Sequence, residues 1–393
     1  MYISRIRLTN WKNFLSVDVP LKQRLFIVGP NASGKSNLLD AFYFLHDIAK
    51  SGGGLDYAIT KRGGIHKIRC LASRRNPIVE IEVELKEKES DETPEPDWVY
   101  TLGIGVQQSG THQPCVKYEK VIKKGDQDPL INRPDNVDKG DEKLLLQTHL
   151  QQISANVKFR VIAEFFAEIR YFQIVPQLIK NPYAFSGENL PEDPYGRDFL
   201  DLLANVPEKT RTRRLKKIES LLKGPVPSLS KLEYKPDVRG RPHLEVKHTS
   251  WRKDAGKQSE KDLSDGTLRM IGLFWSLLEP RQAPLLLEEP ELSLNNAVVQ
   301  QLPELIYKIE KQKKVKGQVF ISTHSYSLLT EYSIGSDEVV ILTPEKEATK
   351  VEIASDKDEV KQLLDSGFNV AEAVYPVINE PITQKNLGDF LDD

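Results

Sequence analysis

The segment at residues 29–36 constrains this chain more than any other. It reads Gly-Pro-Asn-Ala-Ser-Gly-Lys-Ser and fits the pattern G-x-x-x-x-G-K-[ST] at every fixed position. An apolar stretch at 25–28 precedes it and an amphipathic stretch at about 34–48 follows it, which predicts a strand, a tight loop and a helix. Backbone N–H groups of such a loop, together with the helix N-terminus, point at a phosphate group.

This loop predicts ATP and Mg²⁺ as ligands. Lys35 is expected to reach the β- and γ-phosphates, and the Ser36 hydroxyl to ligate Mg²⁺. The alternative, a Gly-rich turn without a ligand, does not account for the strand before the loop and the helix after it. The expected nucleotide contacts on this segment are Gly29, Pro30, Asn31, Ala32, Ser33, Gly34, Lys35, Ser36 and Asn37.

A second apolar strand, at 283–287, ends in carboxylates. Glu288 is expected to hold Mg²⁺ through water, and Glu289 to act as general base on the attacking water. P-loop ATPases usually carry Asp at the first of these positions, so Glu288 departs from the pattern. A solvated acidic strand end is the simpler alternative.

Two further motifs complete the set. A strand at 318–323 ends at His324, and the likeness to P-loop ATPases implies that this side chain contacts the γ-phosphate and senses its loss. Leu263, Ser264, Asp265 and Gly266 precede a helix, for which Ser264 is a good N-cap. The alternative interpretation is a signature loop that reaches the nucleotide bound to a second copy.

Along the chain the motifs come in the order phosphate loop, loop at 263–266, carboxylates at 288–289 and His324. In that order they resemble the ABC-type ATPase head of the SMC/RecF and OLD-nuclease superfamily. The resemblance covers roughly residues 1–70 and 255–345. The segment at 6–14 looks like the family's first strand and turn, near the nucleotide base, which adds Lys12 and Asn13 to the expected contacts. No Q-loop glutamine is located, since Gln173 and Gln177 come late.

The resemblance implies an α/β fold: an ABC-ATPase head with a mixed, largely parallel P-loop core sheet, an antiparallel β subdomain and a helical insertion. It also implies a homodimer, or a larger even-numbered oligomer, closed on ATP and Mg²⁺. Compact heads without long coiled coils are similar to the PARIS, Septu and retron-associated ATPases of bacterial antiphage defence. That likeness implies a separate effector partner of the nuclease class.

Two other functions stay open. One is a RecF-like DNA-repair ATPase that clamps DNA. The other is a slowly hydrolysing scaffold that assembles with ATP bound, which the glutamate at 288 favours.

Composition limits the partners and the cellular compartment that can be expected for this chain. The 393 residues carry a net charge of −2, so no global basic field indicates nucleic acid. Two cysteines, Cys70 and Cys115, predict reduced thiols rather than disulfides. Because no signal peptide and no apolar run of about 20 residues is visible, a cytoplasmic protein without a membrane segment is expected.

The predicted organisation has four parts: an N-terminal lobe at 1–181, a helical and β insertion at 182–257, a C-terminal lobe at 258–345 and a tail at 346–393. The first contains an antiparallel meander at 78–85, 98–106 and 115–122. The polar segment at 123–141 predicts an exposed loop, and 144–166 a helix.

Two remaining sequence features give weaker indications of function. Asp356 and Asp358 have the spacing of a nuclease metal site, but the segment predicts a helix start and is too short for a nuclease domain, so no intrinsic nuclease is expected. Basic residues form one candidate DNA or partner patch and a smaller cluster. The patch comprises Arg211, Arg213, Arg214, Lys216 and Lys217, and the cluster Arg69, Arg74 and Arg75.

Overall fold

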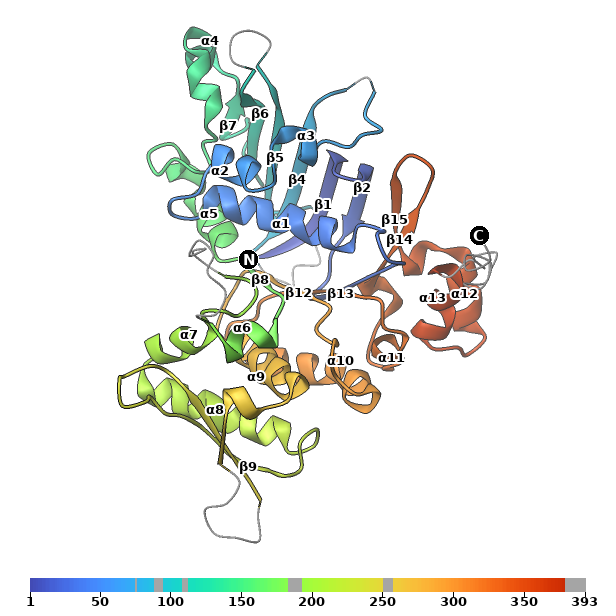
Figure 1. Ribbon diagram of the computed structural model, residues 1–393. Coiled ribbons are helices and arrows are strands. Elements are labelled where there is room, and N and C mark those ends of the chain that lie inside the picture. Colours follow the sequence, from blue (N-terminus) through green and yellow to red (C-terminus); the bar gives the residue numbers. More distant parts are fainter. Residues whose placement is uncertain (75, 88–94, 108–111, 183–192, 250–256, 379–393) are drawn as a thin grey trace, which may run out of the picture. The chain divides into compact units, whose positions relative to one another are not determined.

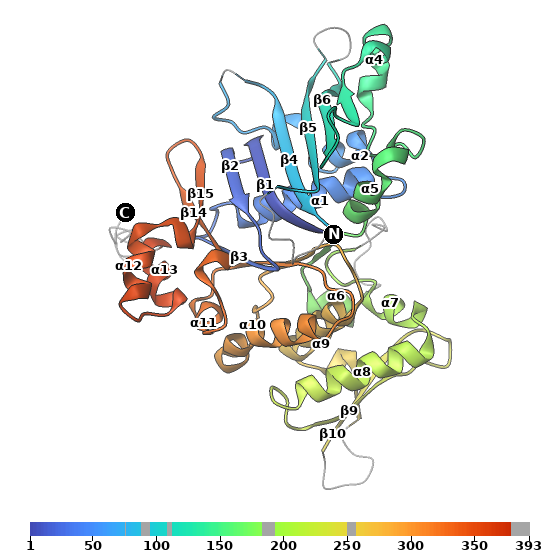
Figure 2. The same cartoon turned by 180° about the vertical axis from the view of Figure 1, so that it is seen from behind.

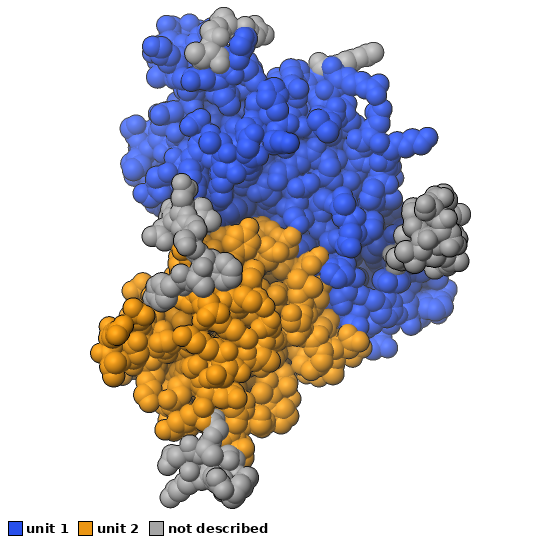
Figure 3. Space-filling model, in the orientation of Figure 1, with its two compact units in different colours: residues 1–170, 281–286, 317–393 blue, residues 171–280, 287–316 orange. Residues whose placement is uncertain are grey.

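A computed structural model describes residues 1–393 except for 75, 88–94, 108–111, 183–192, 250–256 and 379–393. The chain forms two compact units, coloured separately in Figure 3. Unit 1 contains residues 1–170, 281–286 and 317–393, and unit 2 contains residues 171–280 and 287–316. The four-part division predicted above follows the order of the motifs and stays a prediction.

An antiparallel sheet in unit 1 has the order β2-β1-β4-β5-β6-β7. Its strands are β1 (Tyr2–Trp11), β2 (Phe14–Pro20), β4 (Val79–Lys86), β5 (Trp98–Val106), β6 (Pro114–Lys123) and β7 (Ile131–Arg133). In β4 buried and half-buried residues alternate, so one face is apolar. Helix α1 (Lys35–Ala49) covers a face of this sheet (Figures 1 and 2), and the Trp11 and Phe44 rings meet edge to face at 5.2 Å.

A second sheet holds the phosphate loop. Strand β3 (Arg24–Val28) is buried along its whole length and pairs in parallel with β13 (Val319–Thr323) and β14 (Val339–Pro344). Strand β15 (Thr349–Ile353) adds to β14 in the antiparallel sense. A continuous apolar run such as 25–28 is typical of a parallel strand covered on both faces, which is why the short β3 could be predicted from sequence.

Two more strands continue this sheet, in the order β13-β12-β8. In β12 (Leu285–Glu288) the Leu285 N–H donates to the Gln318 carbonyl at 2.8 Å. Next to it, the N–H of Arg170, the first residue of β8 (Arg170–Phe172), donates to the Pro284 carbonyl at 3.2 Å.

The remaining elements of unit 1 are α-helices and 3₁₀ turns. Among them α5 packs against the antiparallel sheet, where the Phe166 and Tyr100 rings lie 5.8 Å apart. The α-helices are α2 (Leu55–Thr60), α3 (Ile65–Ile68), α4 (Asn136–Gly140), α5 (Arg160–Ala167), α11 (Tyr326–Leu329), α12 (Asp358–Asp365) and α13 (Val370–Ile378). The 3₁₀ turns are η1 (Glu142–Leu146), η2 (Asn156–Phe159), η4 (Ser336–Glu338) and η5 (Ala354–Asp356).

Unit 2 combines helices with a small antiparallel sheet of the order β11-β10-β9. Its helices are α6 (Pro176–Lys180), α7 (Phe199–Asn205), α8 (Glu208–Leu222), α9 (Asp265–Leu278), α10 (Asn296–Lys311) and the 3₁₀ turn η3 (Glu260–Asp262). Its strands are β9 (Leu229–Tyr234), β10 (Leu244–His248) and β11 (Lys257–Ser259). Leu215, Ile218 and Leu222 form the buried stripe of α8 at helical spacing.

Most residues of the segment at 123–141 are exposed, as predicted, but the structure corrects the prediction that the whole segment is a loop. This segment contains β7 and α4, joined by the buried Arg133. The Arg133 guanidinium pairs with Asp138 at 2.7 Å and Glu119 at 3.1 Å. A buried arginine is tolerated because both carboxylates neutralise it, and composition alone could not reveal that pairing.

The predicted helix at 144–166 is also wrong over most of its length, since only α5 is α-helical there. The cause lies in the same cluster. The Glu119 carboxylate accepts hydrogen bonds from His149 N–H at 2.7 Å and Leu150 N–H at 3.0 Å. These backbone groups are therefore held by a distant strand and not by a helical turn.

Two expectations from composition can be checked. Cys70 and Cys115 are buried free thiols, as predicted. Across the described residues, no helix has both the length and the apolar character that crossing a bilayer would require.

Candidate nucleotide site

The phosphate loop in unit 1 has the conformation that its sequence predicts. Gly34 caps α1 in the left-handed region, with φ at 99°. A Cβ atom added there would lie 2.2 Å from Asn13 Nδ2. Position 34 therefore excludes a side chain for two reasons, the backbone conformation and the close approach of Asn13.

Asn13, predicted as a nucleotide contact, fastens the loop to its surroundings. Its Nδ2 donates to the Ser33 carbonyl at 2.9 Å and the Thr349 hydroxyl at 2.8 Å. Its Oδ1 accepts from Asn37 Nδ2 at 2.8 Å. One side chain thus joins the loop, helix α1 and strand β15, and so fixes the loop's position.

Lys35 is buried and lies against the loop that precedes it. Its Nζ donates to the carbonyl oxygens of Gly29 at 3.0 Å and Pro30 at 3.1 Å. The ammonium is therefore held against the backbone of the loop, close to where the motif requires a cation for phosphate. Along the rest of the segment, Asn31, Ala32 and Ser36 are exposed, Pro30 and Asn37 are half-buried, and Gly29 and Ser33 are buried.

Lys12 has a different partner from the one predicted. Its Nζ lies 2.5 Å from Asp40 Oδ2 on α1, and Arg62 pairs with the same carboxylate at 2.6 Å. Burial alone would raise the pKa of Asp40, but the two cations more than offset it and hold that pKa below its ordinary value. A direct contact of Lys12 with nucleotide stays a prediction.

His324 follows β13 at the edge of the sheet where the loop begins. Thr323 is paired with Val28 in the parallel register, so His324 and Gly29 are the next residues of two neighbouring strands. The imidazole is exposed. Because carboxyl ends of parallel strands share one edge, this is the arrangement that a γ-phosphate sensor needs.

The two carboxylates predicted for catalysis lie in unit 2. Glu288 accepts a hydrogen bond from the Tyr171 hydroxyl on β8. Glu289 has φ at 42°, a left-handed conformation that strains a glutamate backbone by on the order of 1–3 kcal/mol. Strain of this kind persists where surrounding structure imposes it and is frequent at functional sites. Sequence reasoning missed Tyr171, because no spacing relates it to residue 288.

The proposed signature loop is held by helix α6 in the same unit. Ser264 is the N-cap of α9, as predicted, and its Oγ accepts from Thr267 N–H at 3.2 Å. Asp265 accepts from Gln177 Nε2 at 2.6 Å and from Lys180 Nζ at 2.8 Å. Gln177 therefore helps to hold the proposed signature loop in place.

Close contacts link the signature loop to the segment after Glu289. A Cβ atom on Gly266 would lie 2.6 Å from the Ser293 carbonyl, so the glycine permits that approach. Arg269, one turn along α9, is 8% exposed, and its Nε has no hydrogen-bond partner among the described residues. Burial lowers the pKa of this guanidinium, while Asp265, Glu291 and Glu289 oppose the shift. Sequence reasoning missed Arg269, because nothing in the apolar pattern of this helix marks a single arginine as a contact.

The candidate basic patch on α8 is divided by the structure. Arg211 donates to the Ala204 carbonyl at 3.0 Å and stacks on Tyr234. Arg214 lies over the Trp275 ring, and Lys217 donates to Gln312 at 2.9 Å. Only Arg213 and Lys216 of the five are exposed. In the smaller cluster, Arg74 pairs with Glu347, and Arg75 lies outside the described residues.

The Asp356 and Asp358 pair does not resemble a metal site in this structure. Asp356 ends the turn η5 and Asp358 begins α12, so the helical interpretation of this segment is confirmed. Over the described part of the chain, no group of three or more His, Cys, Asp and Glu side chains is arranged to hold a metal.

Comparison with protein families gives two matches. Residues 25–330 match a family described as "AAA domain, putative AbiEii toxin, Type IV TA system", and residues 3–46 match one described as "P-loop containing region of AAA domain". Among characterised proteins, the DNA replication and repair protein RecF of Synechocystis is 31% identical over 88 residues. That alignment covers 22% of this chain and only 23% of RecF.

Two solved structures show the same fold. One is an Smc head bound to the C-winged helix domain of ScpA, with a TM-score of 0.55, 14% identity, and coverage of 90% of this chain and 98% of that one. The other is a Pyrococcus furiosus Smc head with an extended coiled coil, bound to the C-terminal domain of ScpA, with a TM-score of 0.50, 16% identity, and coverage of 93% and 99%. The predicted α/β head, with a mixed sheet, an antiparallel sheet and helices, is confirmed.

Proposed function

The chain belongs to the AAA-domain family that matches residues 25–330, and we propose that it hydrolyses ATP as a dimerising head that switches an effector protein. The observation that carries the proposal is the loop with its surroundings. Gly34 is left-handed, the Lys35 ammonium lies on the loop carbonyl of Gly29, and His324 follows the strand next to the loop, which together support a phosphate site. A Gly-rich turn without a ligand would need none of these.

The residues fit Mg-ATP. The first turn of α1 directs N–H groups toward the loop, Lys35 supplies the positive charge, and the exposed Ser36 offers a hydroxyl. Ser36 and, through water, Glu288 would hold Mg²⁺, which prefers phosphate and water oxygens to an all-protein cage. When bound, the ion would neutralise charge on the β- and γ-phosphates.

Hydrolysis in this proposal depends mainly on positioning and charge. Glu289 orients water and accepts its proton, Lys35 stabilises the γ-phosphate, and His324 contacts the same group. Ser264 and Asp265 act on the nucleotide of a second copy. ATP then favours the closed dimer because it binds that form better than the open one, and hydrolysis removes the preference.

The output is proposed to be a conformational switch in bacterial antiphage defence, acting on a separate effector, with a nuclease as the leading class. The family description names a toxin of a toxin–antitoxin system, which supports a defence role. The longest described helix, α10, has 16 residues, so the described chain resembles the compact heads and not those with long coiled coils. We place this function in the cytoplasm.

The decisive experiment compares Glu289→Gln with Glu304→Gln. The control removes an exposed carboxylate that pairs with Lys308 on the surface of α10. Phosphate release and solution mass are measured with ATP and Mg²⁺. Glu289→Gln should stop release and accumulate a dimer or larger even-numbered assembly, while Glu304→Gln should behave as wild type.

The opposite result has a definite meaning. If wild type assembles without ATP, and Glu289→Gln changes neither mass nor phosphate release, the nucleotide is a structural ligand. The slowly hydrolysing scaffold would then replace the switch.

A second candidate function is a RecF-like clamp on DNA, favoured by the 88-residue match to RecF. This function requires DNA to stimulate phosphate release and the stimulation to fall steeply with salt. Phosphate release measured with and without duplex DNA, at several salt concentrations, separates the two. Release that is unaffected by DNA supports the effector switch.

A further inference from the structure

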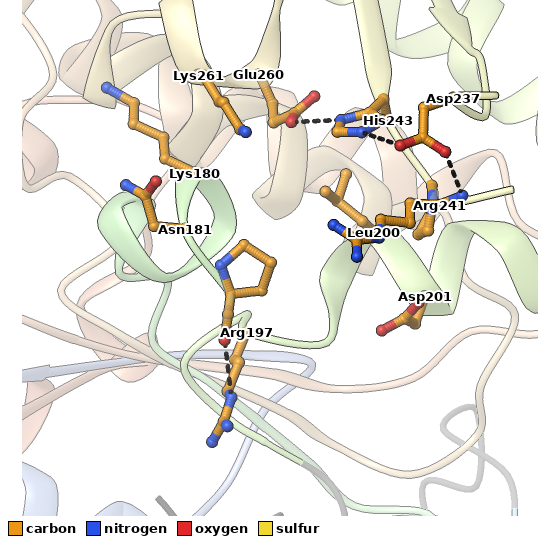
Figure 4. Close-up of a pocket in the computed structure, with 12 residues that line it drawn as sticks. Lys180, Asn181, Arg197, Leu200, Asp201, Asp237, Arg241, His243, Glu260 and Lys261 are labelled. Atoms are coloured by element: carbon orange, nitrogen blue, oxygen red, sulfur yellow. Dashed lines mark hydrogen bonds and ion pairs between the residues drawn. The ribbon is translucent and has the colours of Figure 1, made fainter. Parts of the chain in front are cut away.

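Unit 2 contains a cavity of about 210 Å³ that the proposed chemistry does not use. It lies among α6, α7, η3 and the turn before β10. Figure 4 shows Lys180, Asn181 and Lys261 on one side of it, facing His243 and Arg241 on the other. The remaining labelled side chains at its wall are Arg197, Leu200, Asp201, Asp237 and Glu260.

The carboxylates in this wall are largely committed to donors of the protein. Glu260 is 1% exposed and accepts from His243 Nδ1 at 2.8 Å and Leu244 N–H at 3.1 Å. Asp237 accepts from the N–H groups of Arg239 at 2.8 Å and Arg241 at 2.9 Å. The third, Asp201, is exposed on α7.

The cations are committed in part: Lys180 pairs with Asp265 at 2.8 Å, and Arg197 Nε donates to the Pro182 carbonyl at 3.3 Å. The wall carries four of them, Lys180, Arg197, Arg241 and Lys261, against three carboxylates. Lys261 and Asn181 are exposed, so their side-chain donors are accessible to a ligand. Accessible donors beside engaged carboxylates favour a small anion.

The volume of the cavity limits the size of the ligand that it can hold. The cavity measures about 210 Å³. This volume lies below the roughly 300 Å³ at which pockets for drug-sized ligands begin. A phosphate group with at most a small organic substituent fits these limits.

One residue connects this cavity to the proposed ATPase cycle. Lys180 lines the cavity and also holds Asp265 of the signature loop at 2.8 Å, next to the Gln177 contact at 2.6 Å. An anion in the cavity would compete with Asp265 for the Lys180 ammonium. Its binding would therefore loosen the loop from α6.

We propose that this cavity is a regulatory site for a phosphate monoester or phosphate ion, and that its occupation releases Asp265 to act on the nucleotide of a second copy. The regulatory part rests on the proposed dimer mechanism, whereas binding of the anion does not. The predicted consequence is that the small anion increases the fraction of ATP-bound dimer.

The binding test uses methyl phosphate as the probe, in full-length Lys35→Ala so that the phosphate loop does not contribute. Calorimetry is run at constant ionic strength. We expect saturable binding that weakens at least ten-fold in Lys35→Ala/Lys261→Ala. Lys209→Ala, which removes an exposed cation of α8 outside the cavity, is the matched control and should leave binding unchanged.

The regulatory test uses wild-type Lys35. Methyl phosphate should raise the ATP-dependent dimer fraction at least two-fold, and Lys261→Ala should abolish this increase. If the Lys261 and Lys209 variants bind methyl phosphate equally well, or if added KCl abolishes the binding, methyl phosphate is an adventitious ion only. Either result overturns the proposed site. Binding of single-stranded DNA that methyl phosphate does not displace overturns it in favour of a polynucleotide surface.

Two further outcomes distinguish failure of the regulatory proposal from failure of the proposed function. If methyl phosphate binds as expected but leaves the dimer fraction unchanged while Glu289→Gln still traps a dimer, the regulatory proposal is wrong and the proposed function stands. If Glu289→Gln fails to trap a dimer, the proposed function fails independently of the anion site.

Discussion

At the scale of single residues, the proposed chemistry depends on partners that lie far away in the sequence. Asn13 holds Ser33 and Thr349, and Tyr171 donates to Glu288, 117 residues further along. The motifs identify which residues act, whereas these partners decide how each is oriented. Orientation of this kind typically changes the affinity of a metal or the rate of a reaction by about 10–100-fold.

Tyr171→Phe tests the orientation of Glu288. Without the hydroxyl, one carboxylate oxygen loses its donor, and the long glutamate side chain has more freedom. We expect the Mg²⁺ concentration for half-maximal phosphate release to rise about ten-fold. Tyr332→Phe, on a side chain that is 88% exposed, should not change it. An unchanged Mg²⁺ dependence in Tyr171→Phe would remove this role.

Gly34→Ala tests the loop geometry. The new Cβ would meet Asn13 and force an alanine into φ of 99°, so ATP affinity should fall at least ten-fold. Gly240 has a similar φ of 78° but no atom within 4 Å of an added Cβ. Gly240→Ala therefore reports the backbone strain alone, and its ATP affinity should match wild type in a fluorescent-nucleotide titration.

Asp40→Asn tests the ion pairs beneath Lys12. The pKa of Asp40 is lowered below 3.8, so its ionised form stabilises the fold above that pH, and this stabilisation disappears as the pH falls through the folded-state pKa. The variant should therefore be less stable than wild type near pH 7, and the difference should shrink in acid. Urea unfolding across pH measures this. Asp358→Asn, on a 90% exposed side chain, should leave stability nearly unchanged.

At the scale of secondary-structure elements, helix α8 shows how a run of like charges is divided. Arg211 and Arg214 pack on aromatic rings, and the apolar stripe of the helix faces inward. Arg213 and Lys216 remain exposed. The packed arginines of this helix therefore contribute to stability, and the exposed cations contribute to surface charge.

This division predicts different effects for neighbouring substitutions. Arg211→Ala should destabilise unit 2 by about 1–3 kcal/mol, because carbonyl contacts and the Tyr234 stack are lost. Arg213→Ala should stay within about 0.5 kcal/mol of wild type. Thermal unfolding compares them. For DNA binding, Arg213→Ala/Lys216→Ala is the informative variant, since it leaves packing intact.

At the scale of the whole molecule, the proposal depends on two copies completing each other's sites. The signature loop and the phosphate loop belong to different units of one chain, and the dimer mechanism requires a signature loop from the partner. A chain defective in one motif should therefore be complemented by a chain defective in the other.

Mixing Ser264→Arg with Lys35→Ala tests this complementation. Each variant alone should release almost no phosphate. In an equal mixture half of the dimers are mixed and carry one complete site, so release should recover to about a quarter of wild type. Mixing Lys35→Ala with Lys35→Ala/Lys261→Ala provides the control, which should stay inactive. No recovery in the first mixture would contradict catalysis in trans.

The sequence by itself determined the phosphate loop, the strand before it and the helix after it, the cap at Ser264 and the α/β class, because each is encoded by neighbouring residues. Loop glycines, apolar runs and caps act over a few positions. Only the tertiary structure decided that Lys12 pairs with Asp40, that Arg133 is buried between Glu119 and Asp138, and that Lys180 joins Asp265 to a cavity. These outcomes depend on which charges folding brings together and removes from water, and such pairing leaves no periodic signal along the chain.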